Sequence, residues 1–423
     1  SSGFGAVGTG RGRGLTVARG GAQGAAPAGR AQSLAPSAWE RRNMRVSRRS
    51  GVDPFIVMDV MEAARAAEAE GRDIVHMEVG QPGTPAPAAA RRAAAAALER
   101  ESLGYTVALG LPELRARIAR HYAETAGLRI DPARVVVTAG SSGAFLLAFL
   151  ALFDPGEAVV IGDPGYPSYR NTLGALGIEV RRVSTGPETR WQPGPGDLGD
   201  AAGMLVASPA NPTGSVLSRD ALAALAEACR DRGAALISDE IYQGLTYEGR
   251  AVSALEVWDE AVVVNSFSKY WSMTGWRIGW MVVPDGLIRT VERLAQNLFI
   301  CPSHVGQFAA LAAMDATEEL EAMRRVYAEN RAILAEALPR MGLTGFAPPD
   351  GAFYFWVDVS HLTEDSVALC RALLAEAGLA ATPGPDFDPD RGRRWLRLSY
   401  AGTTEAISEG VRRLAAWLDG TPG

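Results

Sequence analysis

Short apolar runs alternate with amphipathic stretches through the middle of this chain. The runs are rich in β-branched residues, whereas the stretches between them, such as Arg219–Arg232, repeat apolar positions at helical spacing. Short strands separated by helices predict an α/β fold, in which helices cover both faces of a mostly parallel sheet. The predicted strands are Val135–Thr138, Ala158–Ile161, Met204–Ala207, Ala235–Ser238, Ala261–Asn265 and Ile278–Val283.

The pattern changes on both sides of this region. Upstream, Asp53-Pro54 is typical of an N-cap and first turn, so we expect a helix from Phe55 to about Ala69, followed by a strand at Ile74–Val79. Downstream of about residue 300, long helical patterns surround two further strands, which indicates a smaller α+β domain. These helices are expected at Val305–Met314, Leu320–Leu338, Ser366–Ala377 and Thr404–Leu418, and the strands at Ala352–Val359 and Trp395–Ser399.

Residues 1–50 differ from the rest of the chain. Gly, Ala, Ser and Arg dominate there, Glu40 is the only acid, and no apolar periodicity is present. Such a segment buries too little surface to offset its ordering entropy, so we expect a disordered leader. A transit peptide and an over-extended start upstream of Met44 both fit, and we favour the second. The expected division is an arm and small-domain segment at 51–85, a large domain at 86–300 and a small domain at 301–423.

Composition narrows the classes of protein to consider. The chain has 423 residues, is 47% apolar and carries a net charge of −6, so it supports a large core and gives no sign of binding nucleic acid or a membrane. Its longest apolar run, Ala144–Phe153, is too short to span a bilayer. The three cysteines and four histidines form no disulfide or metal-binding pattern, so we expect no metal and a cytoplasmic location.

Lysine occurs only once, at Lys269, among 42 basic residues. Arginine binds carboxylates and phosphates better than lysine does, but it cannot lose a proton near neutral pH and attack a carbonyl carbon. Codon bias explains the scarcity of lysine, but it does not explain a lysine placed behind two serines at the end of an apolar strand. A Schiff-base role and a surviving surface lysine both remain open at this point.

Polar residues gather where the predicted strands end, which is where ligands bind in such sheets. The first strand runs into Gly140-Ser141-Ser142 at the start of an apolar helix, and its free amides and hydroxyls would form a phosphate cup. Other strands run into residues 208–214, 239–242 and 266–269, and Arg277 follows eight residues after the lysine. The predicted site therefore combines a lysine, an acid and a possible phosphate cup.

Three segments carry a family resemblance. They are SPANPTG at 208–214, SDEIY at 238–242 and SFSKYWSMTGWRIGW at 266–280. In this order and separation they resemble the class I/II aminotransferases, which are pyridoxal 5'-phosphate (PLP) enzymes of fold type I in the aspartate aminotransferase superfamily. The resemblance extends from about Phe55 to Leu418 and implies a large domain with a mostly parallel sheet, a smaller α+β domain and a homodimer with shared active sites.

The resemblance also implies catalytic roles for three residues. Lys269 would form the Schiff base with PLP and move the proton between substrate and cofactor. Asp239 would pair with the pyridinium nitrogen, and Tyr242, with Asn211, would hydrogen-bond the 3' oxygen. Taken alone, Asp239 also fits a helix N-cap, and Tyr242 fits a core aromatic.

The remaining implied contacts concern the phosphate, the ring and the substrate. Tyr166 would stack on the ring, Tyr105 would reach the phosphate of the neighbouring subunit, and Arg397 would bind the substrate α-carboxylate. Asn211 and Gly80 would also contact the substrate. Arg277 could alternatively form a structural salt bridge. The phosphate would be bound by Gly140, Ser141, Ser142, Ser266, Ser268 and Arg277.

We therefore predict an aminotransferase that moves an amino group from an L-amino acid to a 2-oxo acid, expected to be 2-oxoglutarate. The rivals are a PLP-dependent carbon–sulfur β-lyase and, more remotely, a PLP-binding regulator. A serine acyl-enzyme with an S-x-x-K motif would need a second lysine, which the chain lacks. No Arg or Lys lies between Arg293 and Arg324, so we expect an apolar or aromatic donor, held by Phe299, Ile300 and Cys301 of one subunit and Tyr166 of the other.

Overall fold

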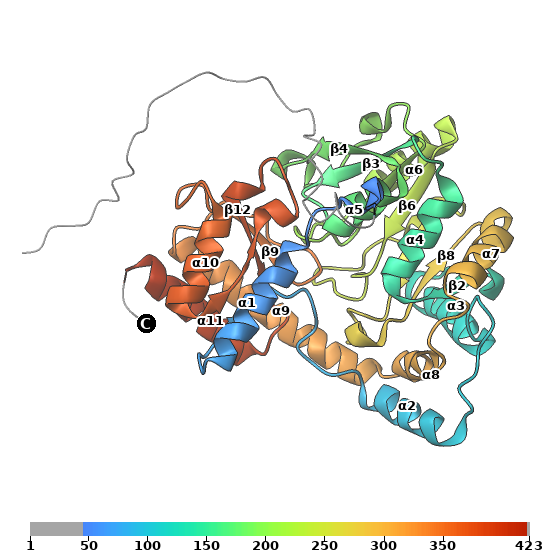
Figure 1. Ribbon diagram of the computed structural model, residues 1–423, viewed down its shortest axis with the longest axis horizontal. Helices are drawn as coiled ribbons and strands as arrows, with labels where there is room; N and C mark the ends of the chain where they lie inside the picture. The colour runs from blue at the N-terminus through green and yellow to red at the C-terminus, as the bar shows by residue number, and fades with distance from the viewer. Residues whose placement is uncertain (1–44, 421–423) are drawn as a thin grey trace, which may run out of the picture. The chain divides into compact units, whose positions relative to one another are not determined.

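A sheet of seven strands lies among helices α4 (Gly140–Leu152), α5 (Pro167–Leu176) and α6 (Arg219–Arg232), in the right-hand part of Figure 1. The computed structural model describes residues 45–420, so almost all of the predicted leader, with Met44, lies outside the described residues. In spatial order the strands are β2 (Val135–Thr138), β8 (Gly279–Val282), β7 (Val262–Ser266), β6 (Ala235–Asp239), β5 (Gly203–Ala207), β3 (Ala158–Asp163) and β4 (Glu179–Ser184). Strand β8 pairs antiparallel with β2 and β7, and the other pairs in the sheet are parallel. This mostly parallel sheet confirms the predicted α/β class.

Successive residues of the central strands pack on opposite faces of the seven-stranded sheet. Val135 and Val137 pack on one face of the sheet with Leu222, whereas Val136 packs on the other face with Phe149. Side chains alternate between the faces of a strand, so valine at every position is expected where helices cover both faces. These helices are α2 (Ala88–Arg100), α3 (Pro112–Ala126), α4 (Gly140–Leu152), α5 (Pro167–Leu176), α6 (Arg219–Arg232), α7 (Ile288–Leu298) and α8 (His304–Ala313).

The edge strand β4 was missing from the sequence prediction. It includes Arg181 and Arg182, and its residues are exposed or partly exposed. Edge strands commonly carry charged residues of this kind, which discourage pairing with other chains. The apolar pattern used to find the central strands is therefore absent from β4.

A second core surrounds a smaller antiparallel sheet. This sheet has the order β11 (Thr382–Pro383), β12 (Trp395–Ser399) and β9 (Tyr354–Asp358), and beside it β1 (Val75–His76) pairs with β10 (Leu379–Ala380). Helices α1 (Ile56–Ala69), α10 (Ser366–Ala377) and α11 (Thr404–Leu418) belong to this region. The strand predicted at 74–79 is thus shorter than expected. None of the helices between residues 45 and 420 is long and apolar enough to cross a membrane.

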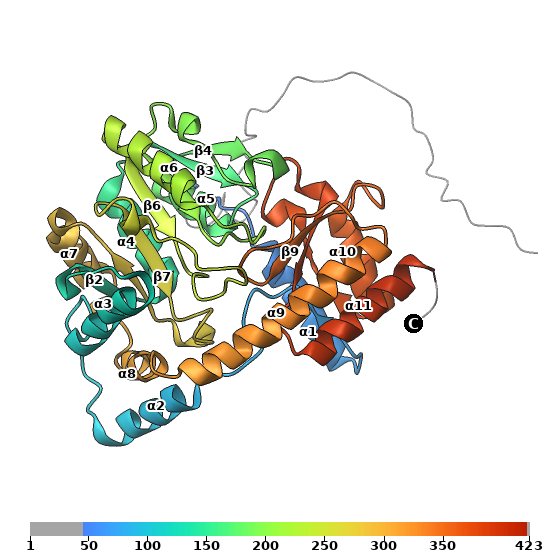
Figure 2. The ribbon, with the colours of Figure 1, turned by 180° about the vertical axis from the view of Figure 1, so that it is seen from behind.

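Helix α9 (Thr317–Arg340) joins the two cores, as Figure 2 shows. Leu320, near its start, packs in a core of the seven-stranded sheet, whereas Tyr327 and Leu338 pack in the core of the smaller sheet. The residues from Arg48 onward form one unit. The domain boundaries expected at residues 85 and 300 therefore stay a proposal.

The start of α1 differs from the prediction. The helix begins at Ile56, its N-cap residue Phe55 provides no side-chain hydrogen bond, and Asp53-Pro54 lies before the first turn. The amides of Ile56 and Val57 instead donate to the carboxylate of Asp386. The predicted N-cap was wrong because the capping group comes from a distant segment of the chain.

Candidate active site

A cavity of about 300 Å³ lies where the polar ends of the central strands meet the smaller sheet. Three of the residues predicted to bind the cofactor do not line it. Gly140 and Ser266 lie directly behind its wall, and Tyr105 is 82% exposed elsewhere on the surface. The predicted residues that do line it are Gly80, Ser141, Ser142, Tyr166, Asn211, Asp239, Tyr242, Ser268, Lys269, Arg277 and Arg397.

Lys269 places its amino group inside this cavity. Its Nζ lies 5.7 Å from the centre of the Tyr242 ring and donates a hydrogen bond to the carbonyl oxygen of Gly80. Burial, reinforced by the charge of Arg397, lowers the pKa of the Lys269 amine to about 7, and Asp239 only partly opposes this effect. A substantial fraction of the amine is therefore neutral and nucleophilic near neutral pH.

Asp239 is a buried carboxylate at the end of β6. Its Oδ1 accepts the Ile241 amide at 3.1 Å, and its Oδ2 accepts the hydroxyl of Tyr169. Burial raises the pKa of Asp239 to about 6, although these two bonds and Lys269 favour the ionised form. Residues 241–244 form a turn and no helix, so the helix N-cap interpretation does not fit.

Tyr169 was not predicted as a site residue. It lies in the first turn of α5, three residues after the N-cap residue Tyr166, and its amide donates to the Tyr166 carbonyl at 3.1 Å. Their rings meet edge to face, with centres 5.3 Å apart. The i, i+3 spacing of two tyrosines was the signal that could have found it.

Arg397 is a buried cation without an acidic partner. It is 2% exposed, Nη1 donates to Oδ1 of Asn211 at 3.0 Å, and the guanidinium lies 4.4 Å from the Tyr354 ring centre. Its Nε has no hydrogen-bond partner, and it makes no ion pair with any of the described residues. Burying such a charge is costly, so this arrangement suits an anionic ligand.

Tyr354 connects this arginine to Tyr242, and the sequence analysis missed it as well. The two tyrosine hydroxyls are 2.8 Å apart, and both side chains line the cavity. A side chain at Gly80 would collide with the Tyr354 hydroxyl, so Gly80 gives this tyrosine its room. Tyr354 therefore contacts Tyr242 through its hydroxyl and Arg397 through the face of its ring.

The opposite end of the cavity contains the predicted phosphate cup. Ser141 and Ser142 lie in the first turn of α4, where backbone amides and the helix dipole favour an anion. Gly140 has a φ of +72°, and a Cβ there would collide with the Arg277 guanidinium. Arg277 donates to the Thr274 carbonyl at 3.0 Å and has no ion pair within the described part of the chain, which disfavours a structural salt bridge.

An apolar wall completes the cavity. It consists of Phe55, Val57, Met58 and Met61, at the start of α1, with Val79 and Ile241 beside them. The Phe55 ring meets the Tyr166 ring edge to face at 5.7 Å. The predicted wall at Phe299–Cys301 does not line the cavity of this chain, and its contribution to a partner subunit stays a prediction.

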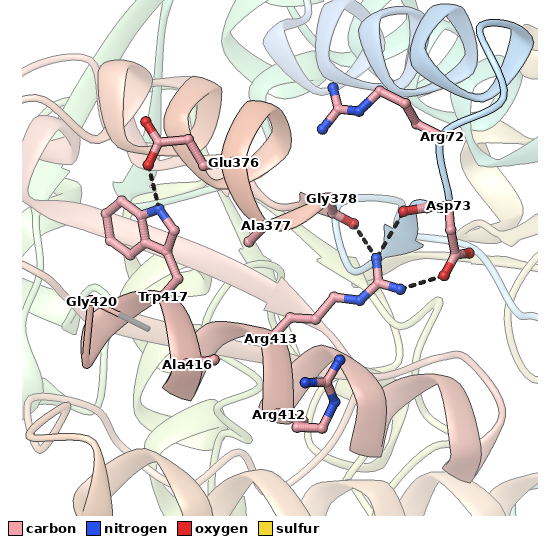
Figure 3. Close-up of a pocket in the computed structure, with 10 residues that line it drawn as sticks. All are labelled: Arg72, Asp73, Glu376, Ala377, Gly378, Arg412, Arg413, Ala416, Trp417 and Gly420. Carbon is pink, nitrogen blue, oxygen red and sulfur yellow. Dashed lines mark hydrogen bonds and ion pairs between the residues drawn. The ribbon is translucent and has the colours of Figure 1, made fainter. Parts of the chain in front are cut away.

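A larger cavity of about 740 Å³ lies between α10 and α11 (Figure 3). Its arginines already have partners: Arg413 pairs with Asp73, Arg412 pairs with Glu409, and Arg72 donates to two carbonyl oxygens at the end of α10. The smaller cavity combines a lysine with a lowered pKa, a buried acid and two arginines without ion pairs to the described residues, so it is the candidate active site.

Comparison with known proteins gives consistent results. The aminotransferase class I and II family matches residues 72–414. The chain is 49% identical over 382 residues to the valine–pyruvate aminotransferase of Mycobacterium tuberculosis, covering 88% of this chain and 98% of the relative. A solved aminotransferase from Mycobacterium tuberculosis has a TM-score of 0.87 and 48% identity, covering 90% of this chain and 100% of that one. Aspartate aminotransferase from Thermus thermophilus, solved with maleate, has a TM-score of 0.82 and 33% identity, with 88% and 98% covered.

The fold and the lysine at its strand ends define a PLP-dependent enzyme of fold type I. The chain belongs to the class I and II aminotransferases. Its activity is therefore amino-group transfer with PLP as cofactor, and the lyase and regulator alternatives are disfavoured. The residues present fit this cofactor, because the cavity supplies a lysine, a buried acid and a helix N-terminus with an unpaired arginine.

Proposed function

We propose that this aminotransferase takes the amino group of an apolar L-amino acid such as valine and gives it to a small 2-oxo acid such as pyruvate. The apolar wall at residues 55–61 carries the proposal. The cations that line the cavity are Lys269, Arg277 and Arg397. In the proposed reaction, Lys269 forms the Schiff base, Arg277 binds the phosphate and Arg397 binds the α-carboxylate. Among the described residues, no further cation lines the cavity to neutralise a second carboxylate.

The same reasoning applies to the acceptor. In the second half-reaction the 2-oxo acid places its side chain where the donor side chain was, so both meet the apolar wall. The distal carboxylate of 2-oxoglutarate would be buried there without a partner, at a cost of several kcal/mol. The name of the Mycobacterium tuberculosis relative also pairs valine with pyruvate. We therefore favour pyruvate over the 2-oxoglutarate expected from the sequence.

The proposed roles follow from the positions of the side chains. Arg397 and Asn211 would bind the α-carboxylate, and Nζ of Lys269 would take up the proton from Cα of the substrate. A pKa near 7 allows this nitrogen to exchange a proton in both directions at neutral pH. When bound, PLP withdraws electrons from the Cα–H bond, and Asp239 holds the proton on the ring nitrogen.

We also propose a homodimer in which Tyr105 completes the phosphate site of the partner. Tyr105 is 82% exposed, and Val107 and Ile300 are 58% and 50% exposed. A hydrogen bond of 2.9 Å from Nδ1 of His304 to the Gly104 carbonyl links the segments that carry them. Large exposed apolar side chains gathered on neighbouring segments are typical of interfaces. A cytoplasmic location stays a prediction.

Stepwise addition of substrates tests the proposed reaction. Purified enzyme loaded with PLP and given valine alone should form one equivalent of 2-oxo acid per site and then stop. Pyruvate should restart the reaction with formation of alanine, and 2-oxoglutarate should do so at least about tenfold more slowly, equivalent to 1.4 kcal/mol. Continuous release of pyruvate and ammonia from an S-substituted cysteine, with no reaction of valine, would instead support the lyase.

A further inference from the structure

The first turn of α1 is capped by a residue that is 330 positions away in the chain. Oδ1 of Asp386 accepts the Ile56 amide at 3.0 Å, and Oδ2 accepts the Val57 amide at 3.1 Å. Asp386 is only 1% exposed. A helix leaves its first four amides without intrahelical partners, so one buried carboxylate satisfies two of these amides in α1.

The two halves of α1 have different surroundings. In the second half, Ala64 and Ala67 pack with Ile74 and Ala380 in a small apolar core. The first half lies over the active-site cavity, and Met58 is 53% exposed. An isolated helix of about 14 residues is only marginally stable in water. Because the first turn of α1 does not pack on an apolar core of the described residues, its helical structure depends on other contacts. Asp386 supplies such a contact at the start of the apolar wall.

Asp386 is itself held by its place next to β11 of the smaller sheet and by a contact with α5. It ends the short segment Gly384–Asp386, which follows β11, and Thr382 of β11 pairs with Arg397. The backbone carbonyl of Asp386 accepts a hydrogen bond of 2.9 Å from Nη2 of Arg170. Arg170 follows Tyr169, the partner of Asp239, on α5. Asp386 therefore links α1 both to α5 and to β11, which pairs with the strand of Arg397.

We propose that Asp386 is a positioning residue for substrate specificity, which holds the first turn of α1 so that Phe55, Val57, Met58 and Met61 form the apolar wall. The inference rests on the proposed function, in which this wall receives the donor side chain. Asp386 does not line the cavity, and both of its side-chain hydrogen bonds go to α1. Its charge also interacts with that of Arg397, an effect that would change KM without changing amide exchange in α1. Its loss should weaken substrate binding while Lys269, Asp239 and Arg397 keep their contacts.

Asp365 offers a matched control. Its Oδ1 also accepts two amides at a helix start, from Val367 at 3.1 Å and Ala368 at 3.4 Å in α10. It does not line the active-site cavity. Asp365→Ala therefore removes a cap of the same chemistry from a helix that contributes nothing to the wall, and any general effect of losing a cap appears in both variants.

The experiment compares Asp386→Ala, Asp386→Asn and Asp365→Ala as PLP-loaded enzymes. Asp386→Ala should raise KM for valine about tenfold with kcat changed less than twofold, and amide exchange in residues 56–61 should accelerate about tenfold. Asn keeps one acceptor oxygen, so Asp386→Asn should fall between the wild type and the Ala variant. Asp365→Ala should lower Tm but leave KM and exchange in α1 unchanged.

Two results would overturn the proposal. One is a fall in Tm for Asp386→Ala with KM and α1 exchange unchanged, which would make Asp386 a structural cap like Asp365. The other is faster exchange in α1 without a rise in KM. If Asp386→Ala does not fold, Asp386→Asn carries the same two readouts. A wild-type enzyme that prefers aspartate would contradict the proposed function, whereas the exchange measurement would still report on the anchoring of α1.

Discussion

At one end of the active-site cavity lie Asp239, the last residue of β6, Lys269, just after β7, and Arg277, just before the antiparallel strand β8. At the other end, the wall is the first half of α1, which is held by Asp386 from a distant segment of the chain. The first end has several charged groups and a buried sheet behind it. The second end is apolar and has little core beneath it.

The difference between the two ends separates chemistry from specificity. Groups that hold a cofactor and move a proton must stay within a fraction of an ångström of their positions, which rigid strand ends provide. A wall that only excludes water and fits a side chain tolerates changes of sequence. Substitutions at the cofactor end should therefore alter kcat, and substitutions at the wall should alter the choice of substrate.

The largest effect is expected at Lys269. Lys269→Arg keeps a positive charge but lacks a nitrogen that can lose its proton, so turnover should fall by at least about a thousandfold. The fold and the bound cofactor should be retained, as measured by circular dichroism and by absorbance after gel filtration. A variant that kept a tenth of wild-type activity would rule out Lys269 as the Schiff-base residue.

Asp239→Asn comes next at the same end. The variant should still bind PLP, but the half-reaction with valine should slow by about a hundredfold or more, because a neutral amide stabilises the protonated ring nitrogen poorly. Stopped-flow absorbance of the bound cofactor gives this rate. A rate close to that of the wild type would leave Asp239 with only a structural role, through its hydrogen bonds to the Ile241 amide and the Tyr169 hydroxyl.

Arg397→Met tests the site between the two ends. Loss of a buried partner for the substrate carboxylate costs about 2–5 kcal/mol, so kcat/KM should fall about 30- to 5,000-fold, mainly through KM. Arg72→Met is the matched control, because Arg72 lines the remote cavity of Figure 3. Equal losses in the two variants would contradict a binding role for Arg397.

Tyr169→Phe should have a smaller effect that depends on pH. The Tyr169 hydroxyl donates to Asp239 and favours its ionised form, so removing it should raise the pKa of Asp239 further above about 6. The ionised fraction then falls at low pH, so activity should drop about threefold to tenfold at pH 6 and little at pH 8. An unchanged pH profile would show that the hydroxyl does not tune Asp239.

The sequence predicted the cofactor end because its residues lie in short local segments. The buried strands have a clear apolar pattern, and the residues that follow them are polar. The wall gave no such signal. Phe55 and Met58 resemble ordinary core positions of an amphipathic helix, and nothing in the local sequence connects Asp386 to α1. Tyr354 was missed because it lies in the apolar run 352–359, where an aromatic residue is expected.

The most direct test of the whole account is the ratio of kcat/KM for valine to that for aspartate, with pyruvate as acceptor. Valine should be favoured by at least about tenfold, because the wall is apolar and, among the described residues, no further cation lines the cavity to pair with a second carboxylate. A preference for aspartate of more than about tenfold, equivalent to 1.4 kcal/mol, would contradict it.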